Sequence, residues 1–557
     1  MSQLDLKAPG PGTWELDATH FERPCSRFLA DLYGPDFERG HREGSANYGI
    51  AIDTIQMRFV DRFAYSSVKP LGAPEGGGGP PPWFLFKLLT LLHPAMRRRL
   101  RAAETALAER RWHADLREWD EQTKPRLARE HAALVAVDVA SLDTEGLIEH
   151  LAAIVERAKD AAYQHHRLAC CSMIPVGDFL AQVGDWTGRD APELLQLLHG
   201  ASEISVDSAG DARRAHIGLR ADPAGAALLD SDASAVEVVS GLAGLPGPGG
   251  DAYRAWVDDV GYRLVTGFDV CDRTLVEMPD LLLKTLRAAG EPAPAAPDLA
   301  PKTAAVRASV SEEQRASFDD LLAEARVVTR LRDERGAHND AIAFGLARRG
   351  LVEVGRRLVD AGKLHDAEHA VELTEAEAIA LLRGQSGPSA DESGAAVAYR
   401  LTYSAADVPA ILGEPPSDPP PFDWFPAAAG RTLRGLLTYV EAMHKEVEPD
   451  GDNVRGMAAS PGVYEGTARI VLGPADFERV EQGDILIAPV TCPTYNILLP
   501  LLGGVVTDRG GLLCHAAIVA REYSIPSVVG CRNATQQIPD GAQVRIDGNS
   551  GRVEVMA

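Results

Sequence analysis

The pattern of apolar and polar residues changes character once along this chain, near residue 457. Before that point, apolar residues recur at the i, i+3, i+4 spacing of amphipathic helices. Helices are expected over roughly 95–135, 143–173, 192–200, 250–288 and 311–363. After it, short β-type runs occur at 467–472, 484–490, 503–508 and 526–530. The segment QVRIDGNSGRVEV (543–555) alternates on both sides of Asp547-Gly548-Asn549, which predicts a β-hairpin.

Proline and glycine divide the chain further. Stretches rich in these residues, unsuited to helix or strand, lie at 70–83, 288–302 and 413–426. We therefore predict a multidomain fold: a large, mainly α-helical domain followed by a compact α+β domain. The expected limits are an N-terminal extension at 1–84, the helical domain at 85–445, a hinge linker at 446–456 and the α+β domain at 457–557.

Composition narrows the classes of partner. The 557 residues include 80 acidic and 56 basic side chains, a formal net charge of −24, which repels nucleic acid and anionic membranes. No run of 18 apolar residues predicts a membrane span, and the first residues do not resemble a secretory signal. The seven cysteines form no CxxC pair. We expect a cytoplasmic protein without nucleic-acid or membrane partners, in which phosphate chemistry depends on local features.

The segment DRGGLLCHAAIVARE (508–522) contains such a feature. VVTD predicts a strand, DRGG a tight turn, and CHAAIVARE a helix that ends before Pro526. His515 then lies in the first helical turn, where free backbone N–H groups and the positive end of the helix dipole favour anions. A neutral imidazole can attack phosphorus there, and Ala516 and Ala517 are expected to leave it accessible. The alternative is a histidine that only caps or packs.

Three motifs in order resemble the swivelling phosphohistidine domain of the phosphoenolpyruvate (PEP)-utilising enzymes. They are ASPGVYEGTARIV (459–471), the run from Asp484 to Gly530 that contains GGLLCHAAIVARE, and IPDGAQVRIDGNSGRVEV (538–555). The resemblance covers 456–557. It implies that His515 carries a phosphoryl group between two sites, with Thr507, Gly510 and Gly511 shaping its loop. Cys514 stands where many relatives have Ser or Thr, and we do not interpret it as a nucleophile.

A carrier also needs a phosphoryl donor. In the resembled family the donor is an ATP-grasp-like domain or a PEP-binding barrel of about 250 residues. Neither is recognisable here, and the glycines at 76–79 are followed by PPPW and not by a Lys-Ser/Thr pair. The resemblance therefore implies a separate ATP-grasp-like subunit that binds ATP with Mg²⁺ or Mn²⁺. We expect no cofactor or metal bound by this chain itself.

The helical region would then bind the acceptor. Residues 10–28, 256–283 and 321–364 resemble rifampin phosphotransferase-like proteins without their ATP-binding domain. They also resemble the histidine-bearing subunit of phenylphosphate synthase and of aryl-ketone (acetovanillone-type) kinases. This resemblance implies a small aromatic hydroxyl compound as the acceptor.

Polar residues that interrupt apolar helix faces supply candidates for the acceptor site. The apolar face from Leu147 to Ala161 continues onto His165, which could take the proton of an acceptor hydroxyl. The apolar face that begins at Leu321 continues onto Arg332, which could neutralise the transferring phosphoryl group. His338 is a second candidate base. For each residue, the structural alternative is a satisfied core histidine or an interhelical ion pair.

The expected function is thus that of the substrate-binding and carrier subunit of a two-component, ATP-dependent phosphotransferase of the dikinase type. ATP would be converted to AMP and phosphate, and a phenolic hydroxyl would be phosphorylated. Two alternatives remain open. One is a biosynthetic or antibiotic-modifying phosphotransferase that acts on a carboxylate or an alcohol. The other is a non-catalytic carrier that passes phosphate to another protein.

Overall fold

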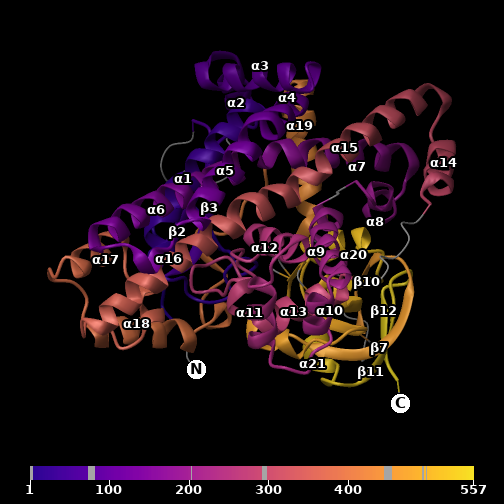
Figure 1. Ribbon diagram of the computed structural model, residues 1–557. Coiled ribbons are helices and arrows are strands. Elements are labelled where there is room, and N and C mark those ends of the chain that lie inside the picture. The colour runs from indigo at the N-terminus through magenta and orange to yellow at the C-terminus, as the bar shows by residue number, and fades with distance from the viewer. Residues whose placement is uncertain are drawn as a thin grey trace. The chain divides into compact units, whose positions relative to one another are not determined.

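The computed structural model describes residues 4–72, 82–201, 204–290, 298–444, 454–491, 495–496 and 498–556 (Figure 1). The chain divides into two compact units. The first contains residues 1–172, 267–272 and 335–434, and the second contains 173–266, 273–334 and 435–557. Among the helices that are described, none combines the length and apolar character needed to span a bilayer.

Unit 1 is mostly helical. Its helices are α1 (Arg27–Asn47), α2 (Trp83–Leu92), α3 (Pro94–Ala108), α4 (Arg111–Glu118), α5 (Lys124–Val135), α6 (Thr144–Arg167), α16 (Ala341–Asp360), α17 (Glu375–Leu382) and α18 (Ala390–Thr402). Helices α1 and α16 both pack against α6. A glycine allows α1 to approach closely, because a Cβ at Gly40 would lie 2.5 Å from the carbonyl oxygen of Tyr163 in α6. This packing positions the rings of α1 beside those at the end of α6.

Unit 1 also contains an antiparallel sheet that the sequence analysis missed. Its strands are β1 (Thr13–Leu16), β2 (Ile52–Val60), β3 (Phe63–Pro70) and β4 (Ile411–Gly413), in the order β2-β3-β1-β4. The hairpin between β2 and β3 turns at Asp61 and Arg62, both with positive φ (44° and 70°). Such turns usually reveal themselves by glycine or asparagine, and this one has neither. Trp14, Phe63 and Tyr65 form the core beneath the sheet.

Unit 2 begins with a second helical group. It contains α8 (Ala191–Leu195), α9 (Ile204–Ala221), α10 (Pro223–Leu229), α11 (Ala235–Ala243), α12 (Pro248–Val260), α13 (Pro279–Ala288) and α14 (Ala300–Ser309). Three further helices, α7 (Ala169–Thr187), α15 (Arg315–Arg335) and α19 (Ala427–His444), belong partly or wholly to this unit. The predicted helical segment 250–288 is wrong in its middle, because 261–278 is irregular and contains a bridge between Leu264 and Thr274.

The last part of unit 2 is the predicted α+β fold. Its eight-stranded mixed sheet has the order β5-β12-β11-β7-β8-β9-β10-β6, with β7, β8, β9 and β10 mutually parallel. The strands are β5 (Val454–Arg455), β6 (Met457–Ser460), β7 (Val463–Ile470), β8 (Asp484–Ala488), β9 (Leu502–Thr507), β10 (Ser527–Val529), β11 (Gln543–Asp547) and β12 (Arg552–Val555). The predicted hairpin is confirmed as β11–β12. Two helices, α20 (His515–Glu522) and α21 (Ala534–Gln537), accompany the sheet (Figure 1).

The long predicted helix at 311–363 is continuous apart from one irregularity. A π-helical turn, Gly336–Asp340, joins α15 to α16. Such turns insert one residue into the helical ladder and rotate the side chains that follow. The predicted hinge at 446–456 falls mostly outside the described residues, as do parts of the stretches at 70–83 and 288–302. The proposed limits of the substrate and carrier domains stay a prediction.

Candidate functional site

His515 is the first residue of α20, as the sequence predicts, and Cys514 is the N-cap. The helix follows β9 through a short loop, and β9 lies parallel to β8. Because the carboxyl ends of parallel strands meet at one edge of a sheet, the segments that follow β8 and β9 converge there. The imidazole therefore lies at a strand edge and at the positive end of a helix.

The imidazole is not exposed, contrary to the expectation drawn from its alanine neighbours. His515 is only 7% exposed. Thr491 Oγ1 lies 3.0 Å from Nδ1, and Asn496 Oδ1 lies 2.8 Å from Nε2. With the amide oxygen facing the ring, Nε2–H donates to Asn496 and the Thr491 hydroxyl donates to Nδ1. Both ring nitrogens are engaged, so a reaction at either nitrogen must first displace a contact.

Charge and burial hold this imidazole neutral. Burial, reinforced by the positive charge of Arg332, lowers the pKa of His515 to about 3. A neutral imidazole keeps a lone pair on one nitrogen, which a nucleophile needs. At neutral pH the residue is therefore a potential nucleophile and not a cation.

Two glycines shape the loop before α20. Gly510 has φ of 108°, a conformation that side chains other than glycine rarely adopt. A Cβ at Gly511 would collide with the carbonyl oxygens of Ala442 and Met443 at the end of α19. The N–H of Gly511 donates to Met443 O at 2.7 Å. The loop is thus held against α19, and this contact depends on glycine.

Two arginines from helices donate hydrogen bonds to the same loop. Arg332 of α15 donates through Nη1 to the carbonyl oxygen of Leu513. Arg521 of α20 donates to Ala459 O at 2.9 Å and to Leu512 O at 2.8 Å. Burial lowers the pKa of Arg521 to about 10, so it stays protonated at neutral pH. The structure thus places the predicted Arg332 beside the His515 loop, and it adds Arg521.

The other predicted loop residues are buried. Thr507 ends β9 with no exposed surface, and among the described residues its hydroxyl has no hydrogen-bond partner. Cys514 is buried too, and burial raises the pKa of its thiol. A protonated, enclosed thiol is a poor nucleophile, which agrees with the expectation that Cys514 is not one.

His165 lies elsewhere, in the last turn of α6 in unit 1. Its Nδ1 contacts Oδ2 of Asp340, the last residue of the π-helical turn. The other oxygen of Asp340 accepts from Asn339 Nδ2 at 2.7 Å. Burial lowers the pKa of His165, and the Asp340 carboxylate opposes that shift. His338, the other candidate base, lies in the same π-helical turn and is half-buried.

The C-terminal part of the chain is similar to known proteins. Residues 480–551 match the family model described as PEP-utilising enzyme, mobile domain. This span contains His515, Thr507, both loop glycines and the contacts at Thr491 and Asn496. Residues 480–551 are thus similar to the mobile domain of PEP-utilising enzymes.

Several curated proteins are similar to part of this chain. An uncharacterised phosphotransferase, YvkC of Bacillus subtilis, is 30% identical over 228 residues, which are 41% of this chain and 26% of that protein. Rifampicin phosphotransferase of Streptomyces sviceus is 40% identical over 116 residues, 21% of this chain and 13% of the relative. A probable phosphoenolpyruvate synthase of Archaeoglobus fulgidus is 40% identical over 100 residues, covering 18% and 13%.

The match spans about a quarter or less of the length of these relatives. A solved structure of Enzyme I covers 44% of this chain and 66% of its own, at 17% identity and a TM-score of 0.13. That score is too low to indicate a shared fold. The sequence likeness of the mobile domain is therefore the informative comparison.

Sequence reasoning missed several residues around the two histidines. Thr491 and Asn496 follow β8, and the rule that parallel strands end together could have indicated them. Asp340 has no comparable signal, because its approach to His165 depends on the π-helical turn. Arg521 was visible in the motif, but its hydrogen bonds across the loop were not predictable from spacing.

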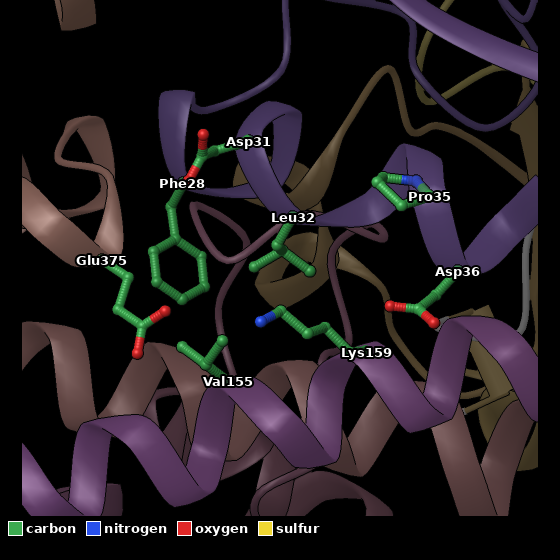
Figure 2. A pocket seen from close by; sticks show the side chains of 8 residues that line it. All are labelled: Phe28, Asp31, Leu32, Pro35, Asp36, Val155, Lys159 and Glu375. Carbon is green, nitrogen blue, oxygen red and sulfur yellow. The ribbon is translucent and has the colours of Figure 1, made fainter.

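Unit 1 also contains a cavity of about 380 Å³ that residues of α1 line in part. Figure 2 shows Phe28, Leu32 and Val155 at its walls, with Lys159 and Glu375 among its charged side chains. None of the predicted site residues lines it. In the part of the chain that is described, no three His, Cys, Asp or Glu side chains are grouped to hold a metal ion.

Proposed function

We propose that this chain is the phosphohistidine carrier and acceptor-binding component of an ATP-dependent phosphotransferase. The observation that carries this proposal is the environment of His515 within the mobile domain of a PEP-utilising enzyme. The imidazole of His515 is neutral, and the residue is the first of helix α20. Two arginines donate hydrogen bonds to the loop that precedes it. Relatives of the mobile domain are named phosphotransferases and phosphoenolpyruvate synthases.

In the proposed first half-reaction, a nitrogen of His515 attacks the β-phosphorus of ATP bound with Mg²⁺ or Mn²⁺ on a separate ATP-grasp-like subunit. A P–N bond forms at the ring nitrogen that carries the lone pair, the P–O bond to the α-phosphate breaks, and the other ring nitrogen releases its proton. AMP leaves with the electrons of the broken bond, and the terminal phosphoryl group of the phosphorylated intermediate goes to water as inorganic phosphate. This chain supplies the nucleophile.

The loop is suited to the product of that step. Phosphohistidine carries a dianionic phosphoryl group, which free N–H groups at a helix start and nearby guanidinium groups stabilise. Arg332 and Arg521 supply these charges beside the backbone of residues 512–513. The low pKa of His515 keeps its lone pair available at neutral pH. In unphosphorylated His515, contacts with Asn496 and Thr491 hold the ring. The phosphoryl group replaces one of these contacts when the P–N bond forms.

In the second half-reaction, the hydroxyl of an aromatic compound attacks the phosphorus of phosphohistidine. The P–N bond breaks and a P–O bond forms, while a base takes the hydroxyl proton. Support for an aromatic acceptor comes from the name of one relative, rifampicin phosphotransferase, and from the ring-rich interior of unit 1. A phenol has an unperturbed pKa near ~10, so a base assists its attack at neutral pH.

The test combines the full chain with a candidate ATP-grasp-like subunit, ATP, Mg²⁺ and a panel of phenols, aliphatic alcohols, carboxylates and rifampicin. We expect an aryl phosphate together with AMP, detected by ³¹P NMR and chromatography. The matched control is the His515→Ala chain with the same subunit. Product formed by that variant at the rate of the unsubstituted chain would refute the carrier role. ATP conversion to AMP by this chain alone would refute the separate donor subunit.

A further inference from the structure

Unit 1 contains a cluster of aromatic and imidazole rings that the carrier chemistry does not use. Helix α1 contributes Tyr33, Phe37 and His41, and the end of α6 contributes His165 and His166. The ring of His166 lies 4.2 Å from that of Phe37, 4.6 Å from that of His41 and 4.9 Å from that of His165, between centroids. Tyr33 Oη lies 3.0 Å from Nε2 of His166. We call these five side chains the ring cluster.

Most of the surface of the ring cluster is buried, but four of its five side chains keep some exposure. Burial lowers the pKa of His41 to about 3 and that of His166 well below its usual value, and it raises the pKa of Tyr33. These groups are therefore neutral at physiological pH. Phe37 is buried, whereas the two α6 histidines, Tyr33 and His41 keep partial exposure, which is 27% for the His165 side chain.

His165 has the arrangement of an oriented base. Asp340 engages Nδ1, and Arg335 Nη1 holds the backbone carbonyl of His165 at 2.7 Å. The Asp340 carboxylate thus occupies one of the two ring nitrogens of His165. Asp340 is itself fixed by Asn339, whose amide also donates to Ala161 O at 2.9 Å and accepts from Arg157 Nη2 at 2.7 Å. A carboxylate that accepts from one ring nitrogen leaves the other ring nitrogen to take a proton, as in the His–Asp pair of a catalytic triad.

We infer that the ring cluster binds the acceptor as a flat, uncharged aromatic hydroxyl compound, with His165 as its base and Asp340 as the residue that positions that base. This inference rests on the proposed function for the phosphoryl group that it consumes. Flat rings and neutral imidazoles favour an aromatic ligand by stacking and edge contacts. The hydroxyl donates to His165 Nε2, and its oxygen attacks phosphorus as that proton moves to His165. The P–N bond breaks, and His165 then returns the proton to solvent.

Binding tests the site without any donor. Calorimetry with 2-naphthol and the full, unphosphorylated chain should show one site, weakened at least about tenfold by Tyr33→Ala and by His166→Ala. The control is Glu375→Gln at the separate cavity of Figure 2, which should leave the affinity unchanged. His515→Ala should also bind normally. Affinity that is lost in Glu375→Gln and kept in both cluster variants would overturn the inference. Circular dichroism of each variant identifies unfolding, and Tyr33→Phe with His166→Gln then replaces a variant that fails to fold.

Transfer tests the roles of His165 and Asp340. The chain is loaded with phosphate by phosphoramidate, freed of reagent and mixed with 2-naphthol. His165→Gln should slow formation of naphthyl phosphate about 10²-fold, with little change in 2-naphthol affinity. Asp340→Asn should slow it less and alter its pH profile, since the carboxylate raises the pKa of His165 against burial and against the charge of Arg335. An unchanged rate in both variants would overturn the base assignment. Normal binding of 2-naphthol with no transfer from the loaded, unsubstituted chain would instead refute the proposed carrier function.

Discussion

His515 and His165 are the same side chain in two opposite settings. His515 begins α20, at the positive end of a helix, beside the cations Arg332 and Arg521. His165 lies in the last turn of α6, at the negative end of a helix, against the carboxylate of Asp340. Burial lowers the pKa of both. A positive setting favours a ring that acquires an anionic phosphoryl group, and a negative setting favours a ring that acquires a proton.

The comparison shows why the residue type alone does not assign a role. Each histidine is made neutral by burial, and the charges nearby decide which charged product is stabilised. The charges around His515 would stabilise a phosphorylated ring, and those around His165 would stabilise a protonated one.

The largest effect should follow the loss of the His515 ring. His515→Ala removes the proposed nucleophile, so phosphate transfer should fall by at least about 10³-fold. The measurement is the rate of aryl phosphate formation. His365→Ala is the matched control, since that side chain is 62% exposed and pairs with Asp391. Equal losses in the two variants would contradict a special role for His515.

Removal of one nearby cation should have the next largest effect. Arg332→Gln removes charge from the loop, and the formation of phosphohistidine should slow by about 10²-fold. The same change should raise the pKa of His515, because Arg332 contributes to lowering it. Arg307→Gln, at an exposed ion pair with Asp319 in the same unit, provides the control. The contrast between the two histidine settings fails if Arg332→Gln is phosphorylated as fast as the Arg307 variant.

The glycine loop should matter for stability as well as for activity. In Gly511→Ala the added Cβ meets the end of α19, which should destabilise unit 2 by about 1–3 kcal/mol. Thermal or urea unfolding measures this cost. Gly473→Ala is the matched control, because a Cβ there meets no atom within 4 Å. Similar unfolding midpoints for the two variants would show that the contact with α19 does not constrain the loop.

Acidification should give the smallest and most gradual effect. His515, and His41 of the ring cluster, have pKa values of about 3 when folded and near 6.5 when unfolded. Between these values the unfolded chain binds more protons, so stability falls as pH decreases from about 6.5 towards 3. Each histidine contributes a slope of up to about 1.4 kcal/mol per pH unit. Urea unfolding between pH 7 and 5 should show a shallower slope for His41→Gln, and an unchanged slope would contradict burial of that neutral ring.

Much of the mobile domain could be predicted from the sequence. Its strands are short and β-rich, the Asp-Gly-Asn turn marks the β11–β12 hairpin, and the loop glycines place His515 at a helix start. These features depend on local sequence. Thr491 and Asn496 contact the His515 ring because the segments after two parallel strands converge. Local sequence does not show this convergence, so the ring was wrongly expected to be accessible.

Unit 1 was less predictable because its key features are not local. Periodicity alone singled out His165, but its pairing with Asp340 requires the π-helical turn that joins α15 to α16. The rings of α1 were not recognised as part of a site. They lie beside α6 through close helix packing at Gly40, which is not a local feature of the sequence. The hairpin β2–β3 was missed because its turn contains Asp61 and Arg62 instead of glycine.

The most direct measurement is the location of phosphate on the chain. The full chain is treated with phosphoramidate for increasing times, digested at alkaline pH and analysed by mass spectrometry. The account predicts that acid-labile phosphate appears first on the peptide that contains His515, and that 2-naphthol removes it. Phosphate on exposed histidines such as His365, with His515 unlabelled throughout, would contradict the account.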